Sequence, residues 1–217
     1  MVTDYEAVTK EFLALLNEHQ ITAPSFHFTT IAAENLVYAY ITPIEGYAAM
    51  DKMSEDWAEV ERRMGKKWQD LMRRGSAAIE YAKQWIVEEL PALFYVPENR
   101  TLKAAGTNFR HYDFYYLHVG KEQEAEQIAQ EWKTLYKRKN VPQYYTVYCA
   151  NMGTELPLYI VGWSAKDATD FRTQRGKSVQ LLGEEGKALW ERILALVRRF
   201  EHKNGYLRPD LSYLPTI

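Results

Sequence analysis

The sequence predicts an α+β fold that consists of two tandem copies of a β-α-β-β-α-β unit. Three observations lead to this prediction. A seven-residue motif occurs twice at a spacing of 118 residues, near the end of each half of the 217-residue chain. Segments rich in aromatic and β-branched residues alternate with amphipathic helical segments, in a similar order in both halves. Aromatic residues make up 14% of the chain and concentrate in these segments.

The repeated motif is Pro-x-Leu-x-Tyr-x-Pro. It spans residues 91–97 and 209–215, and the four specified residues agree in both occurrences. Further pairs at offsets of 118 to 121 are Pro24 and Pro142, Gly65 and Gly183, and residues 37–41 and 158–162. Because a shared offset at several anchors indicates internal duplication, we expect a first repeat over residues 1–106 and a second over residues 107–217.

The second repeat is expected to contain all six elements of the unit. In chain order these are a strand over 112–119, a helix over 122–139, strands over 143–150 and 158–163, a long helix over 168–203 and a short strand over 211–214. Asp167 is suited to cap the long helix, which Gly176 and Gly183 are expected to interrupt. Asn204 and Gly205 are expected to end it.

The first repeat lacks the opening strand. Thr3 and Glu6 form a capping-box pattern, which predicts a helix over 4–19. Strands over 26–31 and 36–42, a long helix over 54–89 broken near Gly75 and a short strand over 93–96 are expected to follow. Without its first strand this repeat has an open sheet edge. The N-terminal residues form no signal peptide, which predicts a cytoplasmic protein, or an exported one if a signal and the first strand were both removed upstream.

The β-α-β-β-α-β order is that of the ferredoxin-like unit. With its duplication, aromatic strands and long second helices, the chain resembles a tandem member of the dimeric α+β barrel superfamily, which includes NIPSNAP-like and antibiotic-biosynthesis-monooxygenase-like proteins. This resemblance implies that the antiparallel sheets of the two repeats pack face to face as a barrel within one chain. It implies little about chemistry, because such folds carry many functions.

Composition excludes several classes of protein. The net charge is -2 and the isoelectric point about 6.2, so a basic nucleic-acid footprint is not expected. A single cysteine excludes an internal disulfide, and no histidine pair has zinc spacing. No apolar run is long enough to cross a membrane. We therefore expect no metal, no nucleic acid and no membrane as partners, and a homodimer remains open.

The candidate site residues are aromatic residues and histidines of the predicted strands. Alternate side chains of a strand face opposite ways, so the smaller Val37, Ala39 and Ile41 are expected to pack under helices. Tyr38 and Tyr40 then face the presumed barrel interior. Tyr159 and Trp163, at the matched positions of the second repeat, are expected to face the same way. The full candidate set is His27, Tyr38, Tyr40, Tyr116, His118, Tyr159 and Trp163.

Three functions remain open at this point. One is the binding of an apolar or aromatic small molecule, because buried tyrosine hydroxyls need hydrogen-bond partners and a ligand could supply them. Another is a cofactor-independent monooxygenase-like enzyme, with His27 or His118 as general base. The third is a non-catalytic interaction module whose aromatic residues are core. Some barrel relatives bind haem, but only a lone inward histidine would support that here, so no cofactor is expected.

Overall fold

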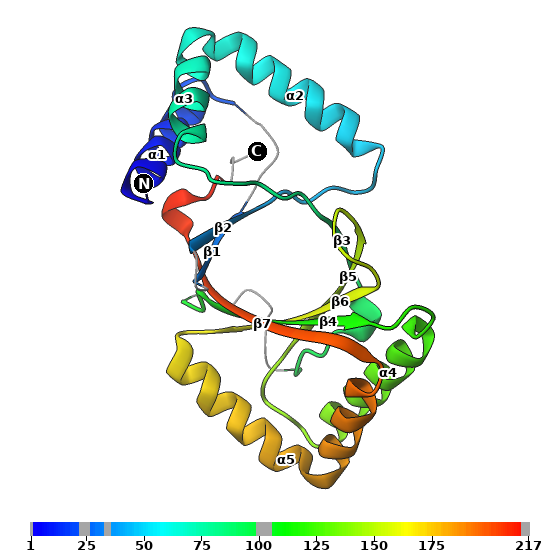
Figure 1. Cartoon of the computed structure of the whole chain (residues 1–217). Helices are drawn as coiled ribbons and strands as arrows, with labels where there is room; N and C mark the ends of the chain where they lie inside the picture. Colours follow the sequence, from blue (N-terminus) through cyan, green and yellow to red (C-terminus); the bar gives the residue numbers. More distant parts are fainter. Residues whose placement is uncertain (1, 22–26, 33–35, 99–105, 214–217) are drawn as a thin grey trace. The chain divides into compact units, whose positions relative to one another are not determined.

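The computed structural model describes residues 2–21, 27–32, 36–98 and 106–213 (Figure 1). For residues 27–32 and 36 the description covers the backbone. The chain forms two compact units, one of Met1–Ala82 with Leu207–Ile217 and one of Lys83–Tyr206. No helix among the described residues has the length and apolarity needed to span a membrane.

The first unit combines helices with one antiparallel strand pair. Its elements are α1 (Val2–Glu18), β1 (His27–Ala32), β2 (Leu36–Ile41), α2 (Ala49–Met64), α3 (Lys66–Ser76) and the short 3-10 helix η2 (Pro209–Leu211). In the strand pair, His27 lies opposite Ile41 and Ala32 lies opposite Leu36. Leu16, Leu71 and Leu211 are almost fully buried in one core, so η2 from the end of the chain belongs to the same hydrophobic cluster as α1 and α3.

The second unit is an α+β layer structure. Its elements are β3 (Ile86–Glu89), η1 (Pro91–Leu93), β4 (Phe109–Leu117), α4 (Glu122–Arg138), β5 (Thr146–Met152), β6 (Leu158–Ala165), α5 (Ala168–Leu194) and β7 (Val197–Leu207). The strands form an antiparallel sheet in the order β7-β4-β6-β5-β3. Figure 1 shows α4 and α5 together on one side of this sheet, and the expected α+β class with antiparallel pairing is confirmed.

Side chains of β4 alternate between the two faces of this sheet. Phe109, Tyr115 and Leu117 pack with residues of α4 and α5 in the main core, which we call the helix-covered face. Phe114 and Tyr116 belong to a separate cluster with residues of β5 and β6, on what we call the opposite face. Both faces of the sheet therefore carry aromatic side chains. Because side chains alternate between the faces along each strand, only residues that share a face can contact one another.

The two predicted long helices are each shorter than expected and end before a strand. The helix expected over 54–89 is α2 and α3, broken at Gly65 with φ 54° rather than near Gly75, and residues 86–89 form β3. The helix expected over 168–203 ends at Leu194, with its kink at Gly183. Asn204 and Gly205 lie inside β7 instead of ending a helix. Asp167 does cap α5, because its carboxylate accepts a hydrogen bond of 2.8 Å from the Asp170 N–H.

Smaller predictions also differ from the structure. Thr3 lies inside α1 and does not cap it. Short strands were expected over 93–96 and 211–214, of which residue 214 lies outside the described residues. The 3-10 helices η1 (Pro91–Leu93) and η2 (Pro209–Leu211) reach into these ranges, and Tyr95 makes a β-bridge to Tyr145. Proline at the start of each repeated motif explains this, because it fixes φ and cannot donate to a strand ladder.

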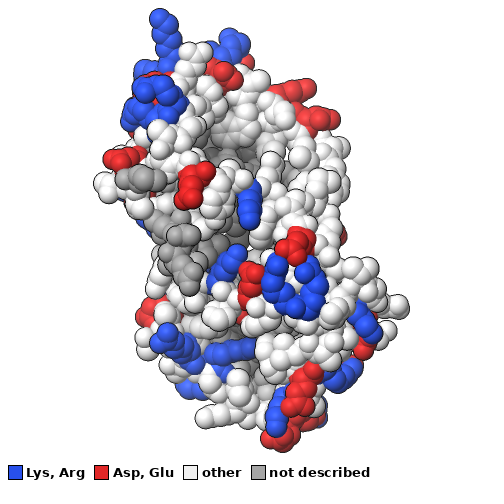
Figure 2. Space-filling view, viewed as in Figure 1, with Lys and Arg blue, Asp and Glu red and all other residues white. Residues whose placement is uncertain are grey.

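Surface charges of both signs lie next to one another on the face shown in Figure 2. Many form ion pairs within one helix, such as Arg62 with Glu59 and Arg73 with Asp70, both at 2.6 Å. Exposed pairs of this kind contribute little to stability. The arginine-rich stretches of α2 and α3 are therefore solvated helix faces.

Candidate ligand-binding face of the sheet

The opposite face of the five-stranded sheet carries a cluster of aromatic residues. Its buried members are Phe114, Tyr116, Ala150, Leu158 and Ile160, with Trp85, Tyr112 and Tyr148 packed against them. The rings of Trp85 and Phe114 meet edge to face, with centroids 6.3 Å apart. This cluster gathers several aromatic rings on one face of the sheet, a chemistry that suits contact with an aromatic ligand.

Gly162 on β6 shapes this surface. A Cβ atom at this position would lie 3.0 Å from the Tyr112 ring and 2.9 Å from the Thr146 hydroxyl. The absence of a side chain therefore lets the Tyr112 ring lie directly over β6. Burial raises the pKa of Tyr112 to about 12, so its hydroxyl stays protonated at neutral pH and can donate a hydrogen bond.

Basic side chains of β7 lie over the rings of this cluster. The guanidinium carbon of Arg199 is 3.8 Å from the centroid of Tyr116, and Arg198 is 5.6 Å from the same ring. The Lys203 ammonium is 4.9 Å from the centroid of Phe114. Cation–π contacts at such distances stabilise by about 0.5 to 2 kcal/mol each. They hold the cations against the aromatic surface.

Two carboxylates accompany these cations. Glu201 lies between Arg199 and Lys203, at 3.1 Å and 3.8 Å, and Glu155 pairs with both Arg198 and Arg199 at 2.9 Å. Hydrogen bonds from the two arginines hold the pKa of Glu155 below its ordinary value. Three basic and two acidic side chains leave this group with one net positive charge, which favours an anionic substituent on a ligand.

The candidate residues of the second repeat divide between the two faces. Tyr116 lies on the opposite face and is 3% exposed. The expectation that Tyr159 and Trp163 share that face is wrong, since both lie in the helix-covered core. The Tyr159 hydroxyl donates a 2.6 Å hydrogen bond to Glu126 on α4, which together with burial raises the tyrosine pKa. Alternation fixes which residues share a face, but it does not say which face the helices cover.

In the first unit, Tyr38 also turns toward a helix. Its hydroxyl donates a 2.7 Å hydrogen bond to Glu6, and its ring centroid lies 4.7 Å from that of Tyr5 on α1. Burial and the Glu6 carboxylate raise the pKa of Tyr38 to about 12. The expected orientation of Tyr38 is therefore wrong as well. Tyr40 on the same strand is 45% exposed.

The histidines do not supply the expected base on the opposite face. His118 is exposed in the turn after β4, where its backbone N–H donates to the Leu196 carbonyl at 2.9 Å. The side chain of His27 lies outside the described part of the structure. His111 and His202 are on the helix-covered side, with rings 6.0 Å apart, and His202 lies in β7, although the sequence predicted a helix there. The described residues thus offer no histidine on the opposite face that fits a haem iron. Nor does any group of three or more acidic, histidine or cysteine residues among them fit a metal ion.

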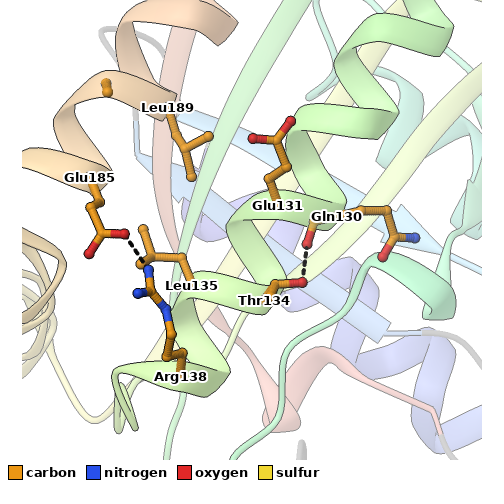
Figure 3. Close-up of a pocket in the computed structure, with 8 residues that line it drawn as sticks. Gln130, Glu131, Thr134, Leu135, Arg138, Glu185 and Leu189 are labelled. Carbon is orange, nitrogen blue, oxygen red and sulfur yellow. Dashed lines mark hydrogen bonds and ion pairs between the residues drawn. The ribbon is translucent and has the colours of Figure 1, made fainter.

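A groove of about 490 Å³ lies between α4 and α5, away from the candidate residues (Figure 3). Leu135, Ala188 and Leu189 form its apolar part, and Arg138 forms an ion pair with Glu185 across it. The remaining lining residues are Gln130, Glu131 and Thr134. It has no aromatic lining residue, and the Arg138 and Lys139 side chains hold the pKa of Glu185 below its ordinary value. The groove therefore offers fewer features typical of a small-molecule site than the opposite face does.

Sequence reasoning missed Arg199, Glu201 and Lys203 because it placed them in a helix. Charged side chains occur at both odd and even positions of this segment, so the sequence shows no alternation of polar and apolar residues. In the structure, exposed and half-buried residues alternate along β7 from Val197 to Glu201. Pairing with β4 places Arg199 opposite Tyr116 and Lys203 opposite Tyr112.

Comparison with known proteins defines the fold. No protein-family profile matches the sequence, and no curated protein matches it. The chain is similar to the solved structure of an anthrone oxidase-like protein, at TM-score 0.54 and 13% identity over 93% of this chain and 86% of that one. It is also similar to a candidate monooxygenase from Fusobacterium nucleatum, at TM-score 0.55 and 10% identity over 94% and 85%. At 10 to 13% identity, these structures show that the chain shares their overall fold.

Proposed function

We propose that this protein binds an aromatic small molecule on the opposite face of its five-stranded sheet. The observation that carries this proposal is the stack of Arg199 on Tyr116 and of Lys203 on Phe114. A planar ligand could lie against the same rings, and an anionic substituent could replace Glu201 as partner of the two cations. Small-molecule sites combine apolar surface with a few polar groups in this way.

We further propose that the fold consists of two tandem ferredoxin-like repeats that form an α+β barrel. Helices α1 and α4 each have 17 residues, and the residues two positions after them, Gln20 and Asn140, share a positive φ of 50°. Gly65 and Gly183 break the second helix of each repeat with φ of 54° and 56°. These equivalent positions support an internal duplication of the chain, for which the few identical residues give less evidence.

Hydrogen bonds of the repeated motif support the same proposal. Tyr95 of the first motif donates to the Val141 carbonyl at 2.9 Å, inside the second unit. Tyr213 of the second motif donates to the Ile21 carbonyl, inside the first unit. Each repeat thus contributes its terminal motif to the unit built mainly from the other repeat, as in an exchange of segments between two copies of one fold.

A binding titration tests the proposed ligand site. Anthraquinone-2-sulfonate, a planar aromatic anion, is added to the full chain while tryptophan fluorescence is recorded. We expect saturable quenching, because the ligand would lie beside Trp85. The variants Phe114→Leu and Arg199→Gln should bind at least tenfold more weakly. Arg192→Gln, which removes an exposed arginine from α5, should bind as the unchanged protein does. Equal affinity in all variants, or no saturable binding together with no co-purified aromatic compound in native mass spectrometry, contradicts the proposal.

A second candidate function is cofactor-independent oxidation of such a ligand by molecular oxygen. The observation that favours it is the Glu201 carboxylate, which lies beside the proposed site and can accept a proton from an activated C–H group. With anthrone as substrate the balanced reaction is anthrone plus O₂ giving anthraquinone plus water. Oxygen uptake should then fall at least a hundredfold in Glu201→Gln while anthraquinone-2-sulfonate still binds. No oxygen uptake above the spontaneous rate in the unchanged protein eliminates this function and leaves the binding role.

A further inference from the structure

A second set of polar side chains is buried on the helix-covered face, apart from the proposed ligand site. Gln143, Tyr145 and Trp163 are 1%, 3% and 4% exposed. The side-chain N–H groups of Gln143 and Trp163 and the hydroxyl of Tyr145 have no hydrogen-bond partner among the described residues. Buried polar groups without partners are rare in folded proteins, so three in one region require an explanation.

Arg175 of α5 contacts Trp163 and is linked to Tyr145 and Gln143 through neighbouring side chains. Its guanidinium carbon lies 5.0 Å from the Trp163 ring centroid, and its Nη1 donates to the Tyr136 hydroxyl at 3.3 Å. The Tyr145 ring lies 5.0 Å from that of Tyr136 and 6.4 Å from that of Trp163. Gln143 joins the same helix face, because its Oε1 accepts a 3.1 Å hydrogen bond from Ser178, three residues after Arg175.

Arg175 also lacks a carboxylate partner within ion-pair distance in the described part of the chain. The buried acid of this region, Asp113, is already engaged. Its carboxylate lies 3.0 Å from His111 Nε2 and accepts a 3.4 Å hydrogen bond from the Tyr115 hydroxyl. The other ring nitrogen of His111 lies 2.7 Å from Asn204 Oδ1, so the histidine stays fixed between Asp113 and Asn204.

We propose that Arg175, Trp163 and Tyr145 form a binding site for a small oxyanion, a carboxylate or a phosphate. The indole N–H and the amide NH₂ group are donors only, so the missing partner must be an acceptor. The guanidinium adds a positive charge and a planar fork that matches such anions. Arg175 is half-buried, which connects the site to solvent. This site is independent of the ligand proposed for the opposite face.

Thermal unfolding of the full chain tests this site. The midpoint is measured in sodium acetate and in sodium phosphate, each against sodium chloride at equal ionic strength. We expect a saturable rise in at least one anion, because a ligand that binds only the folded state stabilises it. A rise in phosphate alone assigns a tetrahedral anion, and a rise in acetate alone assigns a carboxylate. Arg175→Gln should weaken binding at least tenfold. Arg172→Gln, an exposed arginine on the same helix, should not.

A second variant tests the same site in case Arg175→Gln does not fold. In chloride, Tyr145→Phe should unfold at the midpoint of the unchanged protein or above, because the hydroxyl it removes has no partner. In the effective anion it should bind at least threefold more weakly. The proposal is overturned if neither anion raises the midpoint in a saturable way, in which case water alone fills the site. It is also overturned if both variants respond to the anion as the unchanged protein does.

Discussion

At the scale of single residues, Gly162 determines how the Tyr112 ring lies on the opposite face. Replacement by alanine would place a methyl group 3.0 Å from that ring. We expect Gly162→Ala to lower the free energy of unfolding by about 1 to 3 kcal/mol, as overpacking does. Gly176→Ala is the control, because nothing lies within 4 Å of that position on α5 and alanine favours the helix by about 0.5 to 1 kcal/mol. Urea unfolding measures both, and equal stability of the two variants would contradict this account of Gly162.

The ion pairs of Arg208 determine how the first unit responds to acid. Arg208 bonds to Glu6 and Asp210 at 2.6 to 2.9 Å, and these bonds lower the pKa of each carboxyl to about 2, from ordinary values of 4.5 and 3.8. A lowered pKa stabilises the folded state above the unfolded value. This contribution is therefore complete above about pH 4.5 and lost as the pH falls toward 2.

This linkage predicts the behaviour of Arg208→Gln. Because the three side chains are partly exposed, we expect the variant to lose about 1 kcal/mol of stability at pH 7 and much less at pH 2. Urea unfolding at pH 7, 4, 3 and 2 measures the difference. Arg62→Gln, which removes a more exposed pair on α2, should change the profile less. A constant difference between Arg208→Gln and the unchanged protein at every pH would refute the linkage.

The candidate residues show what a single sequence can specify. Alternation correctly separated Tyr116 from its neighbours Tyr115 and Leu117 on β4. It could not orient Tyr38 and Tyr159, because alternation does not say which face of a strand the helices cover. Each of these tyrosines instead donates a hydrogen bond to a glutamate on a helix, a contact between residues 32 or 33 positions apart that no local pattern encodes.

At the scale of elements, β7 shows where local reasoning fails. Its charged residues suit a helix by intrinsic propensity, and the preceding helix pattern continues into it. Hydrogen bonding to β4 along nine residue pairs overrides that preference. In contrast, α4 and the capped start of α5 were predicted closely, because amphipathic period and capping are local properties.

The hydrogen bond of Tyr95 predicts unequal effects of two similar substitutions. Tyr95→Phe removes a buried hydrogen bond to the Val141 carbonyl and should cost about 1 kcal/mol. Tyr145→Phe removes a hydroxyl without a described partner and should cost nothing. Both rings are buried in the same core, so each substitution controls for the other. Equal losses in urea unfolding would show that the Tyr95 bond does not anchor the motif.

At the scale of the whole molecule, the sequence predicted the α+β class with antiparallel strands, which the structure confirms and the similar solved structures support. Element order is encoded along the chain, so it can be inferred without a structure. The division into compact units cannot be inferred from the sequence. Residues 207–217 belong to the same unit as the start of the chain, through contacts such as that of Arg208 with Glu6, about 200 residues apart.

Whether the opposite face of the five-stranded sheet binds an aromatic ligand can be seen in a crystal structure of the full chain with anthraquinone-2-sulfonate. We expect ligand density stacked on Phe114 or Tyr116, with the sulfonate beside Arg199 or Lys203. Density in the groove between α4 and α5, with the opposite face unchanged, would show that this face is not the binding site.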